Sequence, residues 1–358
     1  MRVLISNNYD LELADERHRR GEYPAQHLWG GHALRLAGHR VTFLPLERFR
    51  RLRALTAARV GDLDQQLRIL LGQGSHDVFV SGTVNDSIAL GVLRRLGLYR
   101  RPIVAVVHWP LPAGRARRGI VRWAYGGQDR LLFLSQRVRA QFESLGADPA
   151  RCRKLDWGVD LRFYPADPPP IDIERAPRVI AAGKTDRDYP TLVKAFADLD
   201  VPLDVYCSPA SAPDPATVPP NVAVHYDGAG APDEARAVSD QELMARMSAA
   251  TVVALPTIAP RGTVGLTSLV DAMVMGRPVV MTRNPYIDVD VEGEGIGLVV
   301  EPGNVEGWRA AVARLVADPA EAAAMGRRAR ALCVERYGID QFERTIVDAV
   351  LEVAPGRP

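Results

Sequence analysis

Cysteine is scarce in this sequence, with only Cys152, Cys207 and Cys333 among 358 residues. No two of them form a CxxC pair, and no histidine cluster lies near any of them. We therefore expect neither a disulfide framework nor a zinc site, and a reducing compartment such as the cytoplasm is the natural location.

Long apolar runs and nucleic-acid-binding features are also missing. No stretch approaches the roughly 20 apolar residues that span a bilayer. The N-terminus lacks a secretory pattern, because Asn7, Asn8 and Asp10 follow the first apolar residues at once. No aromatic–basic platform suggests a nucleic-acid partner. We expect a cytoplasmic protein, either free or peripheral to the inner face of the membrane.

Charge is unevenly distributed, although the net charge is only +2. Residues 1–165 contain 27 Lys or Arg against 15 Asp or Glu, a net of +12, and residues 166–358 contain 18 against 28, a net of −10. This asymmetry favours two domains of roughly 150–200 residues. It also suits an anionic membrane or acceptor as partner of the first half, although an arginine-rich composition alone gives the same excess.

Buried strands alternate with helical segments along the whole chain, which predicts an α/β protein with parallel sheets. Strands are expected at 2–6, 41–43, 76–80, 102–107, 131–135, 178–183, 201–207, 221–224, 252–255 and 279–281. Helices are expected at 32–37, 87–97, 137–145, 190–196, 240–248, 266–275, 308–315, 320–336 and 340–353.

Two polar segments of the first half are expected to lie near a ligand. Residues 7–18 are too polar for the core and are predicted to form a loop at the cleft. One or two basic amphipathic helices are expected over 47–71, starting at Glu47. We expect their apolar stripe to face the core, and the alternative is a helix on a membrane surface.

The most informative stretch is 252–282. It reads as a strand, a loop containing Arg261 to Gly265, a helix that begins near Leu266 and Thr267, and a second strand. In a parallel sheet, such a helix points its free N–H groups at the ligand edge, where they favour an anion. Asp271 lies just over one turn into the helix, where a carboxylate could reach a ribose hydroxyl.

Three other positions carry possible chemistry. Gly30 and Gly31 precede a helix and lack Cβ atoms, so a phosphate or sugar can approach the backbone, although a tight turn explains them equally. His108 ends a buried strand, at the edge where ligands bind. Lys184 and Arg187 lie beside a helix start and could hold a diphosphate, the alternative being a solvated charged loop.

The stretch Asp-Ala-Met-Val-Met-Gly-Arg-Pro-Val-Val at 271–280 resembles the nucleotide-sugar signature of glycosyltransferase family 4, whose retaining enzymes have the GT-B fold. That family has Glu, seven residues, Glu, and then Ala-Met-Ala-x-Gly-x-Pro-Val. Asp271 takes the second Glu position, and Thr263, which cannot carry charge, takes the first. Gly-Gly at 30–31, Gly-Val-Asp at 158–160 and Gly-Leu-Val-Val-Glu-Pro-Gly at 297–303 also resemble family motifs.

The resemblance implies an α/β protein with two Rossmann-like domains that face each other across a deep cleft. The first domain, 1–165, would bind the acceptor, through the polar segment and the helices described above. The second, 171–338, would bind the nucleotide sugar, with a Pro-rich linker at 165–170. The last segment, 339–358, would be a helix that packs back towards the first domain.

The resemblance further implies a retaining, metal-independent transfer of a sugar from a nucleotide diphosphate, UDP or GDP in the first place, to a hydroxyl of a secondary metabolite, glycan or lipid-linked acceptor. No cofactor is expected, and Asp-Val-Asp at 288–290 is discounted as a metal motif because cations already serve the nucleotide. The implied catalytic residues are His108, Asp271 and Thr263, and the implied donor-binding residues are Gly30, Gly31, Lys184, Arg187, Gly265, Leu266, Thr267 and Asp271.

Two other functions fit the same features. A sugar-nucleotide 2-epimerase of this fold would turn over the donor without an acceptor. A non-catalytic sugar-nucleotide-binding protein, suggested by Thr263, would bind the donor and never release the nucleotide.

Overall fold

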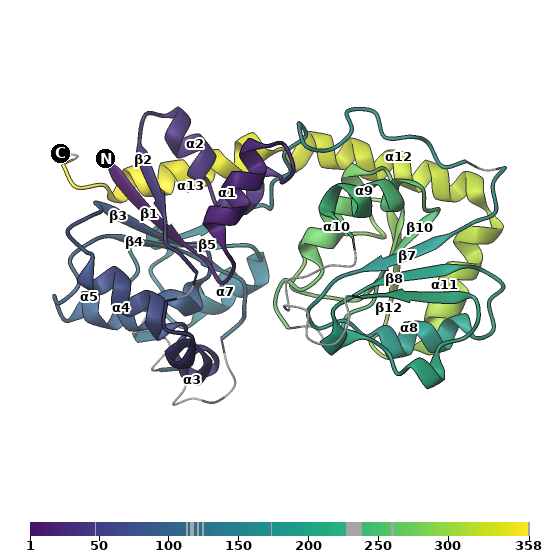
Figure 1. Ribbon diagram of the computed structural model, residues 1–358, viewed down its shortest axis with the longest axis horizontal. Coiled ribbons are helices and arrows are strands. Elements are labelled where there is room, and N and C mark those ends of the chain that lie inside the picture. The colour runs from purple at the N-terminus through teal and green to yellow at the C-terminus, as the bar shows by residue number, and fades with distance from the viewer. Residues whose placement is uncertain are drawn as a thin grey trace. The chain divides into compact units, whose positions relative to one another are not determined.

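The computed structural model describes residues 1–46, 48–111, 114, 118–119, 122–123, 125–172, 174–226, 238–258 and 261–356. They form two compact units, each built around its own sheet (Figure 1). Unit 1 consists of Met1–Asp160 and Ile339–Pro358, and unit 2 of Leu161–Gly338.

The sheet of unit 1 has six parallel strands in the order β2-β1-β3-β4-β5-β6. The strands are β1 (Arg2–Ser6), β2 (Arg40–Phe43), β3 (Val78–Ser81), β4 (Ile103–Val107), β5 (Arg130–Phe133) and β6 (Cys152–Lys154). Near-continuous runs of Val, Ile and Leu are typical of strands that helices cover on both faces, which is why most were predictable. The edge strand β6 was not predicted, because three residues with two cations give no such signal.

Helices cover both faces of this sheet. They are α1 (Leu11–Arg19), α2 (Gly31–Leu36), α3 (Arg50–Val60), α4 (Leu63–Leu71), α5 (Ile88–Arg95), α7 (Gln136–Ser144) and α13 (Ile339–Val353). Figure 1 shows α2 and α13 on one face and α4 and α5 on the other. The C-terminal helix α13 contacts α2 and strands β3, β4 and β5, so it is part of unit 1.

The polar segment after β1 is helical from Leu11 onward, so the prediction of a loop at 7–18 is wrong beyond Asp10. Helix α1 begins after Asp10, whose carboxylate accepts hydrogen bonds from the backbone N–H groups of Glu12 and Leu13. Leu11 and Ala14, one turn apart, are buried. This N-cap and a narrow apolar stripe are enough to fix a helix whose other faces are polar.

The predicted basic helices are α3 and α4, separated by Gly61. Glu47, where the prediction starts, lies outside the described residues. The apolar stripe of α3 does not reach the core as expected, because Leu52 is half-buried and Leu55 is 71% exposed. Helix α4 does reach it, through the fully buried Ile69.

The sheet of unit 2 also has six parallel strands, in the order β12-β11-β10-β7-β8-β9. They are β7 (Val179–Ala182), β8 (Leu203–Tyr206), β9 (Val222–His225), β10 (Val252–Leu255), β11 (Val279–Thr282) and β12 (Gly297–Val300). The helices are α8 (Tyr189–Phe196), α9 (Asp240–Ser248), α10 (Leu266–Val274), α11 (Val305–Ala317) and α12 (Pro319–Arg336).

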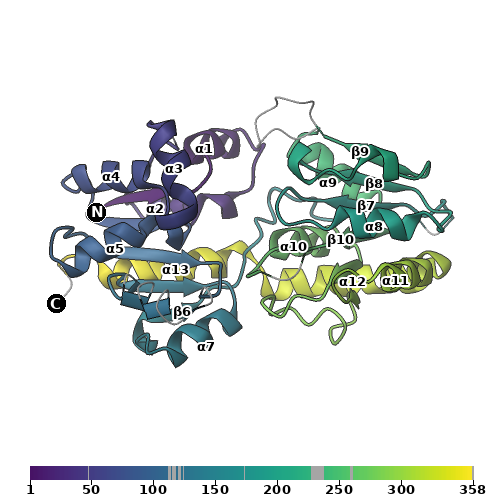
Figure 2. The same ribbon diagram turned by 90° about the horizontal axis from the view of Figure 1, so that it is seen from below.

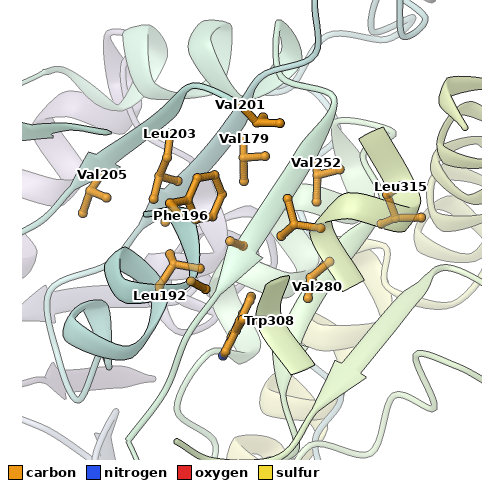
Figure 3. Close-up of a cluster of buried hydrophobic side chains, with 14 of the residues drawn as sticks. Val179, Leu192, Phe196, Val201, Leu203, Val205, Val252, Val280, Trp308 and Leu315 are labelled. Carbon is orange, nitrogen blue, oxygen red and sulfur yellow. The ribbon is translucent and has the colours of Figure 1, made fainter. Parts of the chain in front are cut away.

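Unit 2 is layered in the same way as unit 1. Figure 1 shows α9, α10 and α12 on one face of its sheet and α8 and α11 on the other, and Figure 2 shows the same helices from below. Apolar side chains fill the space between the sheet and helices α8 and α11 (Figure 3). Trp308 and Phe196 are the largest of those that Figure 3 labels, and both are almost fully buried.

The Pro-rich segment after residue 160 is held by side chains of unit 2. The Tyr164 hydroxyl donates a hydrogen bond to Asp271 Oδ1 at 2.6 Å. The guanidinium groups of Arg277 and Arg330 donate to backbone carbonyls within 165–169. The segment therefore belongs to unit 2 from Leu161 onward, slightly earlier than the predicted end of the first domain.

The three cysteines are free and buried. Among the described helices, none is long and apolar enough to cross a membrane.

Candidate functional site

Arg187 is a buried cation in the loop between β7 and α8. The residue is 8% exposed. Its guanidinium lies against the backbone of Gly183, where a Cβ atom would come within 2.3 Å of Arg187 Nε. Gly183 also has a φ of +153°, which only glycine adopts readily. Glycine at the end of β7 therefore allows the guanidinium to lie there.

The hydrogen bonds of Arg187 go to neutral groups, so they do not balance its charge. Nη1 donates to the Thr185 carbonyl at 3.1 Å and Nη2 to Ser268 Oγ at 3.0 Å, while Nε is buried without a hydrogen-bond partner. Within the described residues, no carboxylate forms an ion pair with it, and burial lowers the pKa of its guanidinium. A buried charge and a spare donor are costly, so this arrangement suits a bound anion.

Ser268 belongs to the first turn of α10, so Arg187 lies beside the N-terminus of this helix. The N-cap is Gly265, which offers no side chain to accept from the first amides. The positive end of the helix dipole and the guanidinium group therefore lie side by side, an arrangement that binds phosphate oxygens. The sequence predicted the helix start and Arg187 but not Ser268, the residue that joins them.

Two polar residues that follow strands complete this edge of unit 2, and sequence reasoning missed both. Thr257 follows β10, and its Oγ1 is buried without a hydrogen-bond partner. Asn284 follows β11, and its Nδ2 donates to the carbonyls of Gly262 and Val264 at 3.0 Å each, which fixes the loop before α10. Their position directly after buried parallel strands is the signal that could have found them.

Asp271 lies one turn beyond Ser268 on α10, is half-buried, and accepts the Tyr164 hydrogen bond through Oδ1. The spacing of three residues puts Asp271 and Ser268 on the same side of the helix. Thr267 is exposed and Thr263 is half-buried, with its carbonyl accepting from the Leu266 N–H at 3.1 Å. Their contacts with a donor stay predictions.

Lys184, the second predicted cation, also lies in the loop after β7 and is half-buried. Its carbonyl accepts a hydrogen bond from Ser208 Oγ at 3.3 Å. The discounted acidic motif lies in the loop after β11, where Asp290 Oδ1 accepts from the Gly293 N–H at 2.9 Å. Among the described residues, no group of three His, Cys, Asp or Glu side chains could hold a metal ion.

His108 follows β4 in unit 1 and packs against an aromatic cluster. Its ring lies edge-to-face with Trp29, with 5.6 Å between ring centroids, and Trp29 contacts Trp157 and Phe342 in turn. Nδ1 is buried and has no hydrogen-bond partner. Burial lowers the pKa of His108 to about 4, so the imidazole is neutral at pH 7 and acts as a hydrogen-bonding group rather than a cation.

This shift should appear in the pH dependence of stability. The pKa of His108 is about 4 in the folded protein, against an ordinary value of 6.5 for an unfolded chain. As the pH falls from 6.5 towards 4, the unfolded chain therefore gains a proton that the folded protein does not, and the free energy of unfolding falls. We expect the stability advantage of the wild type over His108→Gln to shrink by up to about 3 kcal/mol between pH 7 and pH 4.

Urea unfolding at a series of pH values measures this advantage. His39→Gln, on the turn before β2, controls for the loss of an imidazole. Burial raises the pKa of Asp86 to about 6. Because Asp86 titrates in both proteins, its contribution cancels in the difference between their free energies of unfolding. Parallel curves for wild type and His108→Gln would contradict the burial of a neutral His108.

Packing explains why residues 30 and 31 are glycines. A Cβ at Gly30 would come within 2.8 Å of Ile346 Cγ2 on α13, and one at Gly31 within 2.8 Å of the Phe43 ring. Gly30 also has a φ of +78°. The turn thus lets α13 and β2 approach the backbone, and a contact with the donor at these glycines stays a prediction.

Gly38 provides a matched control for Gly30, because its φ is +80° and nothing lies within 4 Å of its would-be Cβ. Gly38→Ala should therefore cost about 1–2 kcal/mol for its backbone conformation alone. Gly30→Ala should cost about 1–3 kcal/mol more, from overpacking against Ile346. If Gly30→Ala and Gly38→Ala lose the same free energy of unfolding in urea, α13 moves away from the added methyl group without a loss of stability.

The structure brings the predicted residues together in two groups. In unit 2, the N-terminus of α10 lies beside the β7–α8 loop; in unit 1, Trp29 of the glycine turn lies beside His108. The first group contains Lys184, Arg187, Gly265, Leu266 and Thr267, and the second contains Gly30, Gly31 and His108.

Comparison with protein families gives two matches. Residues 3–163 match Glycosyltransferase Family 4, and residues 231–318 match Glycosyl transferases group 1. Both matched models describe glycosyltransferases, and this protein is a glycosyltransferase. Comparison with curated proteins gives no sequence match.

Solved structures show the same fold. HepE of Anabaena, solved in complex with UDP and glucose, is 16% identical with a TM-score of 0.66, and the match covers 98% of this chain and 99% of that one. Sucrose-phosphate synthase from Thermosynechococcus elongatus is 14% identical with a TM-score of 0.69 over 98% and 99%. WaaG, a glycosyltransferase involved in lipopolysaccharide biosynthesis, is 13% identical with a TM-score of 0.65 over 99% and 100%.

These likenesses confirm the predicted α/β fold of the GT-B class with two Rossmann-like domains. The family matches confirm the prediction that the protein is an enzyme, a glycosyltransferase.

Proposed function

We propose that this glycosyltransferase moves a sugar from a nucleotide diphosphate to an acceptor hydroxyl, with retention of anomeric configuration and without a metal ion. The observation that carries the proposal is Arg187, a buried guanidinium that forms no ion pair among the described residues and lies beside the N-terminus of α10. HepE was solved with UDP-glucose, which makes a UDP-sugar the first donor to test.

In the proposed mechanism, Arg187, Lys184 and the first amides of α10 bind the diphosphate. Their positive charge stabilises the negative charge that develops on the leaving nucleotide, the part that a metal ion plays in other enzymes. These groups are in place before the sugar–phosphate bond breaks, and the acceptor hydroxyl loses its proton as its oxygen bonds to the sugar carbon.

Two further groups orient the donor. Tyr164 donates a hydrogen bond to Asp271 Oδ1 and so orients the carboxylate that we propose binds the ribose hydroxyls. Neutral His108 is the proposed hydrogen-bonding group for the transferred sugar. Retention rests on the family assignment, and the acceptor is expected to bind unit 1.

Thermal unfolding with UDP, GDP, ADP, dTDP and their common sugars, each with and without magnesium, tests the donor site. A ligand at about 100 times its dissociation constant adds about 2.7 kcal/mol of stability. We expect a shift with one diphosphate that does not depend on magnesium. A shift that requires magnesium would overturn metal independence, and no shift with any nucleotide would overturn the diphosphate site.

Incubating the donor without an acceptor separates transfer from the epimerase alternative. A 2-epimerase converts the sugar nucleotide into its epimer, which NMR spectroscopy detects directly. A transferase leaves the donor unchanged or hydrolyses it slowly, and it releases nucleotide faster once an acceptor hydroxyl is supplied.

A further inference from the structure

Unit 1 contains a cavity of about 460 Å³ that the proposed reaction does not use. Its volume is typical of small-ligand sites. Apolar side chains of β5, α7 and the chain before β5 line its floor, and cations stand at its rim. The floor residues used below are Leu131, Tyr125 and Phe142, and the rim residues are Arg95, Arg122 and Arg151.

The rim has more positive charge than its own carboxylates balance. Arg151 pairs with Asp148 at 3.7 Å, and in the described part of the chain no other carboxylate pairs with the three rim arginines. The Arg95 guanidinium lies 5.3 Å from the centre of the Trp123 ring and donates to the Trp123 carbonyl at 3.4 Å. An anionic group is therefore the natural partner of this rim.

Large apolar side chains stand in the solvent beside these arginines. Leu96 and Leu98, in the turn that ends α5, are 58% and 59% exposed, and Trp123 is 41% exposed. Arg95 joins this turn to the cavity rim. We call this surface the docking face, and it consists of Arg95, Leu96, Leu98, Arg122, Trp123 and Arg151.

The docking face lies towards the amino ends of the strands of unit 1. Leu98 precedes β4 and Arg151 immediately precedes β6, whereas His108 follows β4. In a parallel sheet the reacting edge is the carboxyl one, so the docking face lies away from it, while the cavity wall also includes Leu111, three residues after His108.

We propose that the docking face binds the surface of an anionic phospholipid membrane. Lipid phosphates contact the three arginines, Trp123, Leu96 and Leu98 enter the headgroup layer, and the cavity receives part of an acyl chain. Arginine beside tryptophan and leucine is the combination that binds at a bilayer interface. The net charge of +12 over residues 1–165 adds attraction to an anionic leaflet.

Vesicle sedimentation tests the proposal with lipid as the probe. Wild-type enzyme should bind vesicles of dioleoylphosphatidylcholine mixed equally with dioleoylphosphatidylglycerol, bind less at high salt, and bind poorly to phosphatidylcholine alone. The double substitution Arg95→Glu and Arg122→Glu should weaken binding at least about tenfold, because each arginine near such a surface contributes about 1 kcal/mol.

Matched controls lie at the opposite edge of the sheet, near β2. Leu36→Ser removes a leucine that is even more exposed, at 76%, and Arg40→Glu reverses an exposed arginine; both variants should bind vesicles as the wild type does. Brominated lipid should quench tryptophan fluorescence in the wild type and much less in Trp123→Phe. Thermal unfolding with the preferred nucleotide checks that every variant is folded and still binds donor.

Several results would overturn the proposal. Equal binding to neutral and anionic vesicles would remove the part played by the arginines, and unchanged binding of the double variant would place contact elsewhere. Binding of free oleate without binding of vesicles would make the cavity a site for a single amphiphile. Donor binding is measured separately from vesicle binding. A protein that binds donor but no vesicles would overturn only the docking face, and one that binds vesicles but no nucleotide would overturn only the proposed transfer.

Discussion

Arg187→Met should abolish donor binding while leaving the free enzyme at least as stable as the wild type. The guanidinium is buried, forms no ion pair with a carboxylate of the described residues and has an unused Nε–H, so its desolvation is only partly offset until an anion binds. We expect the free energy of unfolding without ligand to stay level or rise by up to about 2 kcal/mol. The value of kcat/KM should fall at least about 100-fold, the typical effect of removing one donor that stabilises developing charge.

Two variants control this experiment. Arg187→Lys keeps the charge but loses the planar fork that reaches Thr185 and Ser268, so it should bind the donor with intermediate affinity. Arg309→Met removes a guanidinium of unit 2 that pairs with Asp198 and Glu306. It should lose up to about 1 kcal/mol of stability and keep the full nucleotide-induced shift.

Thermal unfolding with and without nucleotide, together with initial rates, gives both readouts. If Arg187→Met retains the nucleotide shift, Arg187 does not bind the diphosphate. If the variant instead loses about 3–5 kcal/mol without ligand, the guanidinium has a structural partner and its burial is not a sign of an anion site.

Trp308→Ala should cause the largest loss of stability, about 3–5 kcal/mol. Trp308 on α11 is 1% exposed and packs in the core of unit 2 with Phe196, Val280 and Leu315 (Figure 3). Truncation removes buried apolar area and leaves a cavity between two helices and a sheet, which cannot collapse without moving α11.

Urea unfolding followed by circular dichroism measures this loss. Trp308→Phe keeps most of the buried surface and should lose less than half as much. Trp123→Ala, at a 41% exposed position of unit 1, should change stability by less than about 1 kcal/mol. A small effect of Trp308→Ala would mean that α11 is not anchored to the sheet by this side chain.

The strands and most helices follow from local sequence. The stretch 252–255 was predicted as a strand, and β10 has the same bounds, because an uninterrupted apolar run between polar segments is typical of a parallel strand buried on both faces. Helix α10 begins at Leu266 as predicted, because Gly265 has a φ of +93° and cannot continue a helix backwards.

Helix α1 and strands β6 and β12 were not predicted, and the first two have weaker local causes. Helix α1 depends on one carboxylate that caps it and on two buried residues, a small signal within a polar segment. Strand β6 has three residues and forms because β5 offers it an edge to pair with. Neither the pairing partner nor the cap geometry is visible in a hydrophobic pattern.

The sequence by itself determined the α/β class, the order of most strands along the chain, and the polar residues that follow two of them, His108 after β4 and Lys184 and Arg187 after β7. Only the tertiary structure decided which of them meet. Arg187 and Ser268 are separated by 81 residues, Tyr164 and Asp271 by 107. Apolar periodicity is a local property of the chain, whereas the burial of a charge depends on which distant backbone and side chains surround it, and that depends on packing.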